Sequence, residues 1–388
     1  MEGIIMVSSL EQKNFNLAQE VLRNRLSIVE FSTLTGKSYR QSQRLIKRVE
    51  ELGLIGVKHG NTGKTPANKT PNEKRLQVQQ LLAQKYKDFN LSHFGEKLWE
   101  EEGITLKRET LRKWAHQVHL VKKARRRSKK RVHKPRPRMA REGMLIQFDG
   151  SEHLWFGPEA PVYWLIGGID DATSKVLWLQ FFESEDSLSC MKVMKESTQR
   201  YGVPLAYYLD QAGHFGKQHS EQNTTQIGRA LEELNCKVLL ASSPQAKGRI
   251  ERLWGTLQDR LIAELQLHKI TTIESGNQFL QEYFIADFNK RFSVSARETS
   301  SAYMPLPEQL NIDRVFSLVE ERKITQANIF SLNGVEYQVL SNDNLKYRRI
   351  KIHTFTDKQI EYWVGNRKVE VKENRFYNRK QPKLQSAA

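Results

Sequence analysis

The chain has 388 residues, with 62 Lys and Arg against 44 Asp and Glu, and a formal net charge of +18 at pH 7. A mean hydropathy of −0.63 and the lack of any run of about 18 apolar residues argue against a membrane protein. Two cysteines, Cys190 and Cys236, exclude a disulfide framework or a CxxC metal site. The surplus of positive charge predicts a polyanionic partner, most simply nucleic acid.

The first residues lack a basic segment followed by a long apolar core. We therefore expect no secretory signal, and a cytoplasmic protein.

Residues 14–65 are predicted to form a helix-turn-helix DNA-binding domain. A helix, a turn at Gly36 and a second helix follow one another in "SIVEFSTLTGKSYRQSQRLIKRVEELGLI". The helical spacing places Leu45, Val49 and Leu52 in the core. The opposite face of the second helix would enter the major groove of DNA; it carries Arg40, Gln41, Arg44, Lys47 and Arg48. A plain three-helix bundle without DNA contacts is the alternative.

Residues 70–121 are predicted to form a second helix-turn-helix domain. Its last segment, "ITLKRETLRKWAHQVHL", indicates a short helix whose basic face carries Lys107, Arg108 and Arg112. A plain helical bundle is again the alternative, but two such units in tandem favour DNA binding.

Residues 122–140 are predicted to be a basic linker. Eleven of the seventeen residues in "KKARRRSKKRVHKPRPR" are Lys or Arg, without an apolar period. Such a segment is expected to be extended in isolation and to become ordered on DNA phosphates. The candidate contacts are Arg125, Arg126, Arg127, Lys129 and Lys130. A solvated linker or a localisation tag is the alternative.

Residues 141–310 show an α/β order. The runs "GMLIQFDGSEHLWF", "YWLIGGIDDAT" and "KVLWLQFFESED" predict an antiparallel meander. A helix over 188–201, a strand in "PLAYYLD", a threonine-capped helix and the strand "CKVLLAS" follow. In residues 312–376 short strands return, with an Asn-Gly hairpin turn in "IFSLNGVEYQVL". They predict a small β-barrel, followed by a disordered tail over 377–388. The whole chain is therefore predicted to be a multidomain α/β protein.

The segment "SSPQAKGRIERLWGTLQDRL", residues 242–261, predicts an amphipathic helix with Ser243 as N-cap and Pro244 at the first helical position. Its apolar face carries Ile250, Leu253, Trp254, Leu257 and Leu261. Glu251 lies off that face, with Gly248 and Gly255 one turn to either side. Because a glycine inside a helix costs about 1 kcal/mol against alanine, the pair indicates that something bulky approaches this carboxylate.

Three acids are candidate metal ligands. Asp149 lies within the first strand, on the face opposite Ile146 and Phe148, and Asp210 ends the strand "YYLD". With Glu251 they could hold two Mg²⁺ ions, which stabilise the attacking and leaving oxygens of a phosphoryl displacement. Nearby Lys247, Arg249 and Arg252 would hold phosphates. Each acid alone is more often a cap, a turn residue or a surface charge, so spacing leaves both interpretations open.

The motifs "FDG", "IDDAT", "LD" and "SPQAKGRIER" resemble the ribonuclease-H-like core of DDE transposases and retroviral-type integrases. The last has the Pro-Gln-x-x-Gly-x-x-Glu form of that family, ending at Glu251. Together with "GRALEELN" and "NKRFSV", these motifs are most similar to bacterial insertion-sequence transposases of the ISNCY kind. The resemblance covers roughly residues 72–310, and the outer regions more loosely.

The resemblance implies a mixed five-stranded sheet with flanking helices, and an Asp149, Asp210 and Glu251 site with two Mg²⁺ or Mn²⁺ ions. It implies hydrolysis at the ends of a transposable element and joining of the freed 3′-OH to target DNA, without a Ser or Tyr nucleophile. The implied partners are terminal inverted repeats, target DNA and further copies of the chain. The implied place is the bacterial cytoplasm, at the nucleoid.

Two departures accompany the resemblance, and Asp170 and Asp171 are expected to shape a turn between strands rather than to bind metal. Gln211 stands where a basic residue is expected after Asp210, and Gln258 stands where many relatives carry Lys or Arg, so that Arg260 would have to substitute. His153 and His214 each follow a candidate aspartate by four positions; a structural hydrogen bond is favoured over a role in orienting water or phosphate.

Two other functions stay open. A DNA-binding regulator with a decayed core would lack cutting activity. A ribonuclease for RNA–DNA hybrids would prefer hybrids to DNA ends, although tandem helix-turn-helix units favour duplex DNA.

Overall fold

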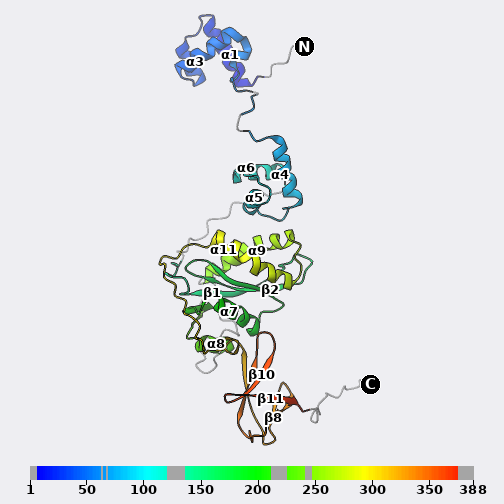
Figure 1. The fold of residues 1–388 in the computed structure, drawn as a ribbon. Coiled ribbons are helices and arrows are strands. Elements are labelled where there is room, and N and C mark those ends of the chain that lie inside the picture. The colour runs from blue at the N-terminus through cyan, green and yellow to red at the C-terminus, as the bar shows by residue number, and fades with distance from the viewer. Residues whose placement is uncertain are drawn as a thin grey trace, which may run out of the picture. The chain divides into compact units, whose positions relative to one another are not determined.

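The computed structural model describes residues 7–62, 64–66, 69–119, 136–210, 225–240 and 247–374. The chain divides into two compact units, Met1–Leu76 and Gln77–Ala388, which are described separately (Figure 1). Among the described residues, no helix is both long and apolar enough to span a bilayer.

The first unit is a bundle of three helices followed by a short 3₁₀ segment: α1 (Ser9–Leu22), α2 (Ile28–Thr35), α3 (Tyr39–Leu52) and η1 (Gly53–Val57). Serines at positions 8, 27 and 38 cap these helices, each in a capping box with Glu or Gln three residues later. Gly36 ends α2 in the left-handed conformation, as predicted for the turn.

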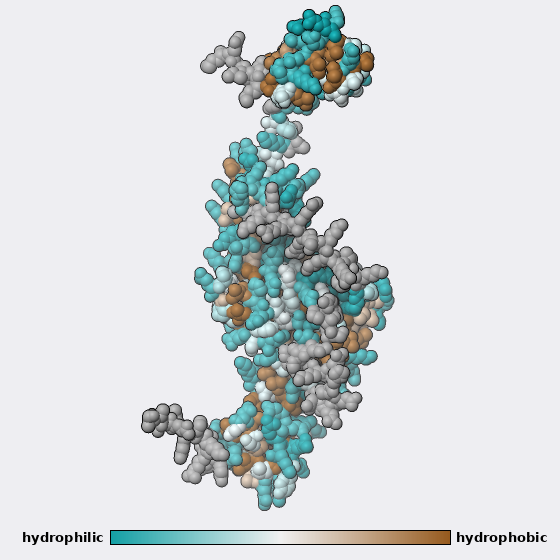
Figure 2. Space-filling view, turned by 180° about the vertical axis from the view of Figure 1, so that it is seen from behind, coloured by the Kyte–Doolittle hydropathy of each residue, from teal (hydrophilic) through white to brown (hydrophobic). Residues whose placement is uncertain are grey.

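One predicted core residue of this unit is wrong. Leu45 and Val49 are buried, but Leu52 is 57% exposed. The reason lies at Gly53, whose positive φ of 59° ends α3 and turns the chain into η1. Val57 then packs into the bundle, and Ile46 is buried as well. Figure 2 shows hydrophobic side chains gathered on the visible face of this unit.

Helices α4 (Asn72–Gln84), α5 (Leu91–Glu100) and α6 (Arg108–Gln117) form a second bundle around Tyr86, Phe94 and Leu98. Ala263, which belongs to α9 (Gly248–Leu267), takes part in the same cluster. Two further groups of polar contacts join this bundle to α9. Glu264 accepts hydrogen bonds from His93 Nε2 at 2.7 Å and Lys97 Nζ at 2.9 Å, and Arg260 donates two bonds to Glu96.

The central sheet has the strand order β3-β2-β1-β4-β5, from β1 (Ile146–His153), β2 (Tyr163–Asp170), β3 (Val176–Phe182), β4 (Ala206–Leu209) and β5 (Lys237–Leu240). The first three strands pair antiparallel, which confirms the predicted meander. Strand β4 pairs parallel with both β1 and β5. This is the mixed five-stranded sheet that the resemblance implies.

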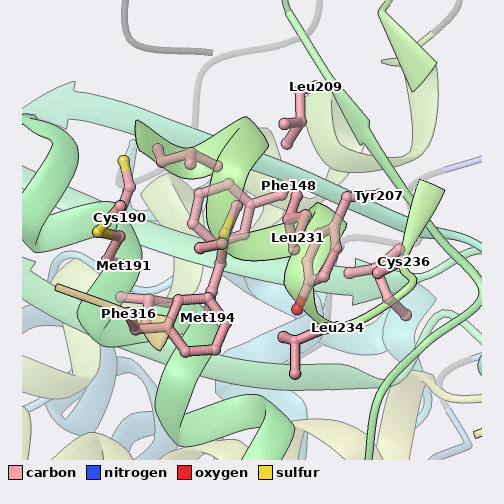
Figure 3. Packing of buried hydrophobic residues seen from close by; sticks show 14 of the residues in the cluster. Phe148, Cys190, Met191, Met194, Tyr207, Leu209, Leu231, Leu234, Cys236 and Phe316 are labelled. Atoms are coloured by element: carbon pink, nitrogen blue, oxygen red, sulfur yellow. The ribbon is translucent and has the colours of Figure 1, made fainter. Parts of the chain in front are cut away.

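Helices cover both faces of the sheet (Figure 1). On one face, α7 (Ser187–Tyr201) and α8 (Gln226–Glu233) pack on β1 and β4; Figure 3 shows Phe148 and Tyr207 pointing into this cluster. On the other face lie α9, α10 (Ile273–Phe279), the π-helical segment η3 (Leu280–Phe284) and α11 (Ile285–Phe292). The threonine cap predicted for the helix before β5 is confirmed at Thr225.

The C-terminal region begins with α12 (Ile312–Val315). A six-stranded sheet follows, in the order β6-β9-β10-β11-β8-β7, built from β6 (Leu318–Lys323), β7 (Ile329–Leu332), β8 (Val335–Leu340), β9 (Arg349–Thr354), β10 (Ile360–Val364) and β11 (Arg367–Glu373). Asn333 and Gly334 both have positive φ, which confirms the Asn-Gly hairpin. Closure of this sheet into a barrel stays a prediction.

Candidate active site

Asp149 lies in β1 on the face that packs against α9. Lys247 Nζ donates a hydrogen bond of 2.8 Å to Asp149 Oδ1, and Trp254 Nε1 donates one of 3.3 Å to Oδ2. The Lys247 side chain is 6% exposed and that of Asp149 is 23% exposed. Ile146 and Phe148 point into the cluster on the opposite face, as the alternation of the strand predicts. The carboxylate is therefore held by a buried cation and still reaches solvent.

Asp210 follows directly after β4, the parallel neighbour of β1. Gln147 is the register partner of Tyr208. Asp149 and Asp210 each stand two positions further along these strands. The two residues therefore stand at the same level of adjacent parallel strands, beside the carboxyl end of β4, where α/β sheets present ligands.

Glu251 stands on the stripe of α9 that faces Asp149. It is four residues after Lys247 and three before Trp254, and residues three or four apart share a face of a helix. Both of those side chains reach Asp149. Glu251 itself is exposed. Glu251 therefore lies at the solvent-exposed edge of the contact between α9 and Asp149.

In the described part of the chain, α9 begins at Gly248 with Lys247 as its N-cap. The predicted N-cap Ser243 and the predicted first helical residue Pro244 lie outside the described residues. Gly248 is therefore the first helical residue, where the cost of a glycine inside a helix does not apply, and only Gly255 is interior. A Cβ atom on either glycine would meet nothing within 4 Å. Nothing in the described structure requires these glycines, and the surface above them is open.

A fourth carboxylate, Glu185, approaches this site from the segment between β3 and α7, and sequence reasoning missed it. Burial, followed by the negative charges of Asp149 and Asp210, raises the pKa of Glu185 to about 7. A Cβ atom on Gly150 would lie 2.5 Å from Glu185 Oε1. The only sequence signal was a glycine directly after Asp149, because "FFESED" offers three acids without distinguishing them.

Arg249 and Arg252 leave the start of α9 in different environments. Arg249 is 13% exposed and donates a hydrogen bond of 2.9 Å to Asp171 Oδ1, so it is engaged inside the protein. Arg252 is exposed. Asp170 has its predicted role in a turn, since its carboxylate accepts bonds from Thr173 and from the Gly143 amide.

Asp171 has a larger role than the turn predicted for it. Its fully buried carboxylate joins β1, α9 and the segment before β1. The donors are Gln147 Nε2, Arg249 Nη1, Arg136 Nη2 and the Met139 amide.

The acidic residues fit a divalent cation in type but do not form a closed cage. Among the described residues, no three His, Cys, Asp or Glu side chains gather closely enough to hold a metal ion. The raised pKa of Glu185 shows that negative charge concentrates here, and carboxylate oxygens are the ligands that Mg²⁺ prefers. An ion at Asp149 Oδ1 would compete with the Lys247 ammonium for the same oxygen.

The remaining predicted residues fall into three groups. Arg260 cannot substitute at the DNA-facing position, because it is buried and paired with Glu96; Gln258 donates to Ser151 Oγ at 3.3 Å. His153 lies beside Trp155, and its buried Nδ1 has no partner among the described residues. The positions outside the described residues are Gln211, His214, Arg125, Arg126, Arg127, Lys129 and Lys130.

The predicted DNA-contacting side chains on α3 and α6 lie mostly in solvent. Arg40, Arg44 and Lys47 are exposed, and Arg48 is half-buried with a bond of 3.5 Å to the Lys58 carbonyl. The exposed side chains near α6 are Lys107, Arg108 and Arg112, the last paired with Glu109.

Two proteins of known family are similar to this chain in sequence. The "Putative transposase y4bF" of Sinorhizobium fredii is 32% identical over 375 residues, covering 94% of this chain and 81% of that protein. The "Transposase for insertion sequence IS1202" of Streptococcus pneumoniae is 33% identical over 314 residues, covering 71% of this chain and 67% of that protein. No family model matches the chain.

Solved structures with a similar fold have low overall agreement. The magnesium complex of the HTLV-2 integrase catalytic core domain is 16% identical, covers 37% of this chain and 90% of that one, and has a TM-score of 0.29. The Mos1 strand transfer complex is 13% identical, covers 74% of this chain and 96% of that one, and has a TM-score of 0.28.

Proposed function

Because the chain belongs to the insertion-sequence transposases, we propose that it binds the terminal inverted repeats of its element, cuts DNA there and joins the freed 3′-OH ends to target DNA. The single observation that carries the site is the convergence of three elements. Asp149 lies within β1, and Asp210 directly follows its parallel neighbour β4. Helix α9 carries Glu251 on the stripe that contacts Asp149.

In this proposal Asp149, Asp210 and Glu251 hold two Mg²⁺ or Mn²⁺ ions. When bound, such ions supply the activation of the attacking oxygen and the stabilisation of the leaving oxygen. The donor set supports this, since the charges of Asp149 and Asp210 add to the effect of burial in raising the pKa of Glu185. The Mg²⁺ named for the HTLV-2 integrase core is carried over as part of the proposal.

The chain's own residues have separate tasks. Lys247 balances the charge of Asp149. A divalent ion at the same oxygen would leave its ammonium available to a DNA phosphate. Arg252, exposed beside Glu251, holds the neighbouring phosphate. Gly248 and Gly255 leave the approach to Glu251 open. Arg249 stays with Asp171 and contributes positive potential rather than a free contact.

DNA recognition is assigned to the basic parts of the chain. The exposed face of α3 and the face near α6 are proposed to bind the terminal repeats, through helix-turn-helix contacts. The basic linker over 122–140 is proposed to follow the phosphate backbone, with affinity that falls as salt rises. Paired ends require more than one copy, so a homo-oligomer on DNA is part of the proposal, at the bacterial nucleoid.

The test is a nicking assay on labelled duplexes taken from the inverted repeats that flank the gene. With Mn²⁺, the wild type should nick at the repeat end. Glu251→Gln should lower the rate at least about 100-fold, because it removes a ligand whose loss costs several kcal/mol, and should still bind the duplex. Glu232→Gln, an exposed carboxylate on α8, is the matched control.

Two outcomes would favour the other functions. Binding of the repeats without a nick, in wild type and variant alike, would support a DNA-binding regulator with a decayed core. Faster cutting of an RNA–DNA hybrid than of the repeat ends would support a ribonuclease.

A further inference from the structure

An open cavity of about 130 Å³ lies along α9, on a flank turned away from Asp149. Arg249, Arg252 and Leu253 line it from α9, and Phe288 and Phe292 line it from α11. Arg249 is two residues after Lys247, and residues two apart on a helix point in nearly opposite directions. The cavity is therefore distinct from the carboxylate site and separated from it by the exposed ridge of α9.

Positive charge is concentrated on one side of this cavity. Arg138 is fixed by a 2.7 Å bond to Ser174 Oγ and by longer bonds to the Asp171 and Ala172 carbonyls. Arg136 and Arg249 both bind the Asp171 carboxylate. Arg138 and Arg252 add two guanidinium groups that do not bind this carboxylate, so three positive charges are in excess of the one negative charge of Asp171.

The charges of these guanidinium groups act on one another. Burial lowers the pKa of Arg249, the Asp171 charge opposes that shift, and Arg136, Arg138 and Arg252 lower it further. Arg252 Nε donates a 2.9 Å bond to the Gly248 carbonyl. Its two Nη atoms have no hydrogen-bond acceptor in the part of the chain that is described, so they are available to an anion.

The opposite side of the cavity is aromatic. The rings of Phe288 and Phe292 lie 4.6 Å apart between centroids. The Arg260 guanidinium lies 4.7 Å from the centroid of Phe292, and its bonds to Glu96 fix it there. The Phe292 ring therefore lies in the same cavity as the available Nη donors of Arg252. This combination suits a ligand that is both planar and anionic. Nucleotides have this chemistry, because every base has a face that stacks on aromatic side chains.

We propose that this cavity binds one unpaired nucleotide of a DNA strand that crosses α9, with its phosphate on Arg252 and Arg138 and its base against Phe288 and Phe292. The inference rests on the proposed function for the identity of the ligand as DNA. The path is open, because Gly248 and Gly255 lie between Glu251 and this flank, and a Cβ atom on either would meet nothing. The cavity thereby fixes the strand next to the bond that is cut.

The experiment uses the full chain and a repeat-end duplex with a single-stranded 3′ extension containing 5-iodo-2′-deoxyuridine. Under ultraviolet light this base bonds to an adjacent aromatic ring with loss of hydrogen iodide, and peptide mass spectrometry locates the bond. We expect crosslinks at Phe292 or Phe288. Phe292→Leu, which keeps an apolar side chain, should lower the yield about 10-fold, the equivalent of one lost base stack. Phe279→Leu on α10 is the matched control.

A second measurement separates base from phosphate recognition. Fluorescence anisotropy compares the same extension with an abasic extension of equal charge. Arg252→Gln should weaken the binding of both probes, and Phe292→Leu only that of the probe with bases. Because the Arg252 side chain is exposed, Arg252→Gln should leave the fold intact, and weaker binding would report the lost phosphate contact.

The outcomes are distinct. Crosslinks elsewhere with an unchanged yield in Phe292→Leu, or equal binding of both probes by the wild type, would overturn the nucleotide pocket. If the wild type nevertheless cuts repeat ends, the transposase proposal stands without it. A wild type that neither binds nor cuts these duplexes would overturn both.

Discussion

Replacing Asp171 by Asn tests the buried ion cluster that joins β1, α9 and the segment before β1. Asparagine has the same shape, so no cavity forms, and the change removes one negative charge. Arg249, 13% exposed, then keeps its buried guanidinium without a counter-charge, and the Met139 amide faces a carbonyl or an amide group in place of a carboxylate. Removing one partner of a buried pair costs about 3–5 kcal/mol.

The lower end of that range applies here, because Arg136 is 40% exposed and water screens its share. A loss of about 3 kcal/mol corresponds to a fall in Tm of roughly 6–12 °C for a domain of 150–250 residues. Differential scanning calorimetry of the full chain measures it. Asp313→Asn is the matched control, because its pair with Lys195 is 58% exposed on the aspartate side and such pairs contribute about 0–1 kcal/mol. A Tm for Asp171→Asn within about 2 °C of the wild type would refute the reasoning.

Three further predictions follow from the same structure. Leu45→Ala should destabilise the first unit by about 2–5 kcal/mol and Leu52→Ala by less than about 0.5 kcal/mol, as measured by urea denaturation; equal losses would contradict the exposure of Leu52. Burial raises the pKa of the Glu264 carboxyl, but the hydrogen bond from His93 and the charge of Lys97 outweigh burial and lower this pKa below 4.5. Its contribution to stability is therefore present above about pH 4.5 and is lost as pH falls through the lowered value. The melting temperatures of the wild type and Glu264→Gln should therefore approach each other as the pH is lowered from 4.5. Millimolar Mg²⁺ should raise the Tm of the wild type by mass action. It should raise the Tm of Lys247→Gln by more, because this variant lacks the competing ammonium. An identical rise in both proteins would show that Lys247 does not compete with the ion for Asp149.

The strands of the central sheet were predictable because each has a local sequence pattern. Runs of aromatic and β-branched residues separated by short polar turns predicted β1 to β3. Single residues predicted the end of one helix at Gly36 and the start of another at Thr225. Asp149 was assigned to its correct face by alternation alone, and Asp170 to its turn.

The contacts that the sequence did not predict are long-range. Glu185 reaches Gly150, Arg260 pairs with Glu96 and Asp171 gathers donors from three segments. Periodicity says which face of an element is buried, but not which charged side chain lies opposite it.

The most direct test of the central claim is the joining of pre-cut repeat ends to a supercoiled plasmid, which bypasses the first cut. We expect joined products with the wild type and Glu232→Gln in Mg²⁺ or Mn²⁺. We expect none with Glu251→Gln, although that variant binds the same ends. Normal joining by Glu251→Gln would contradict the assignment of Asp149, Asp210 and Glu251 as the site of DNA cutting and joining.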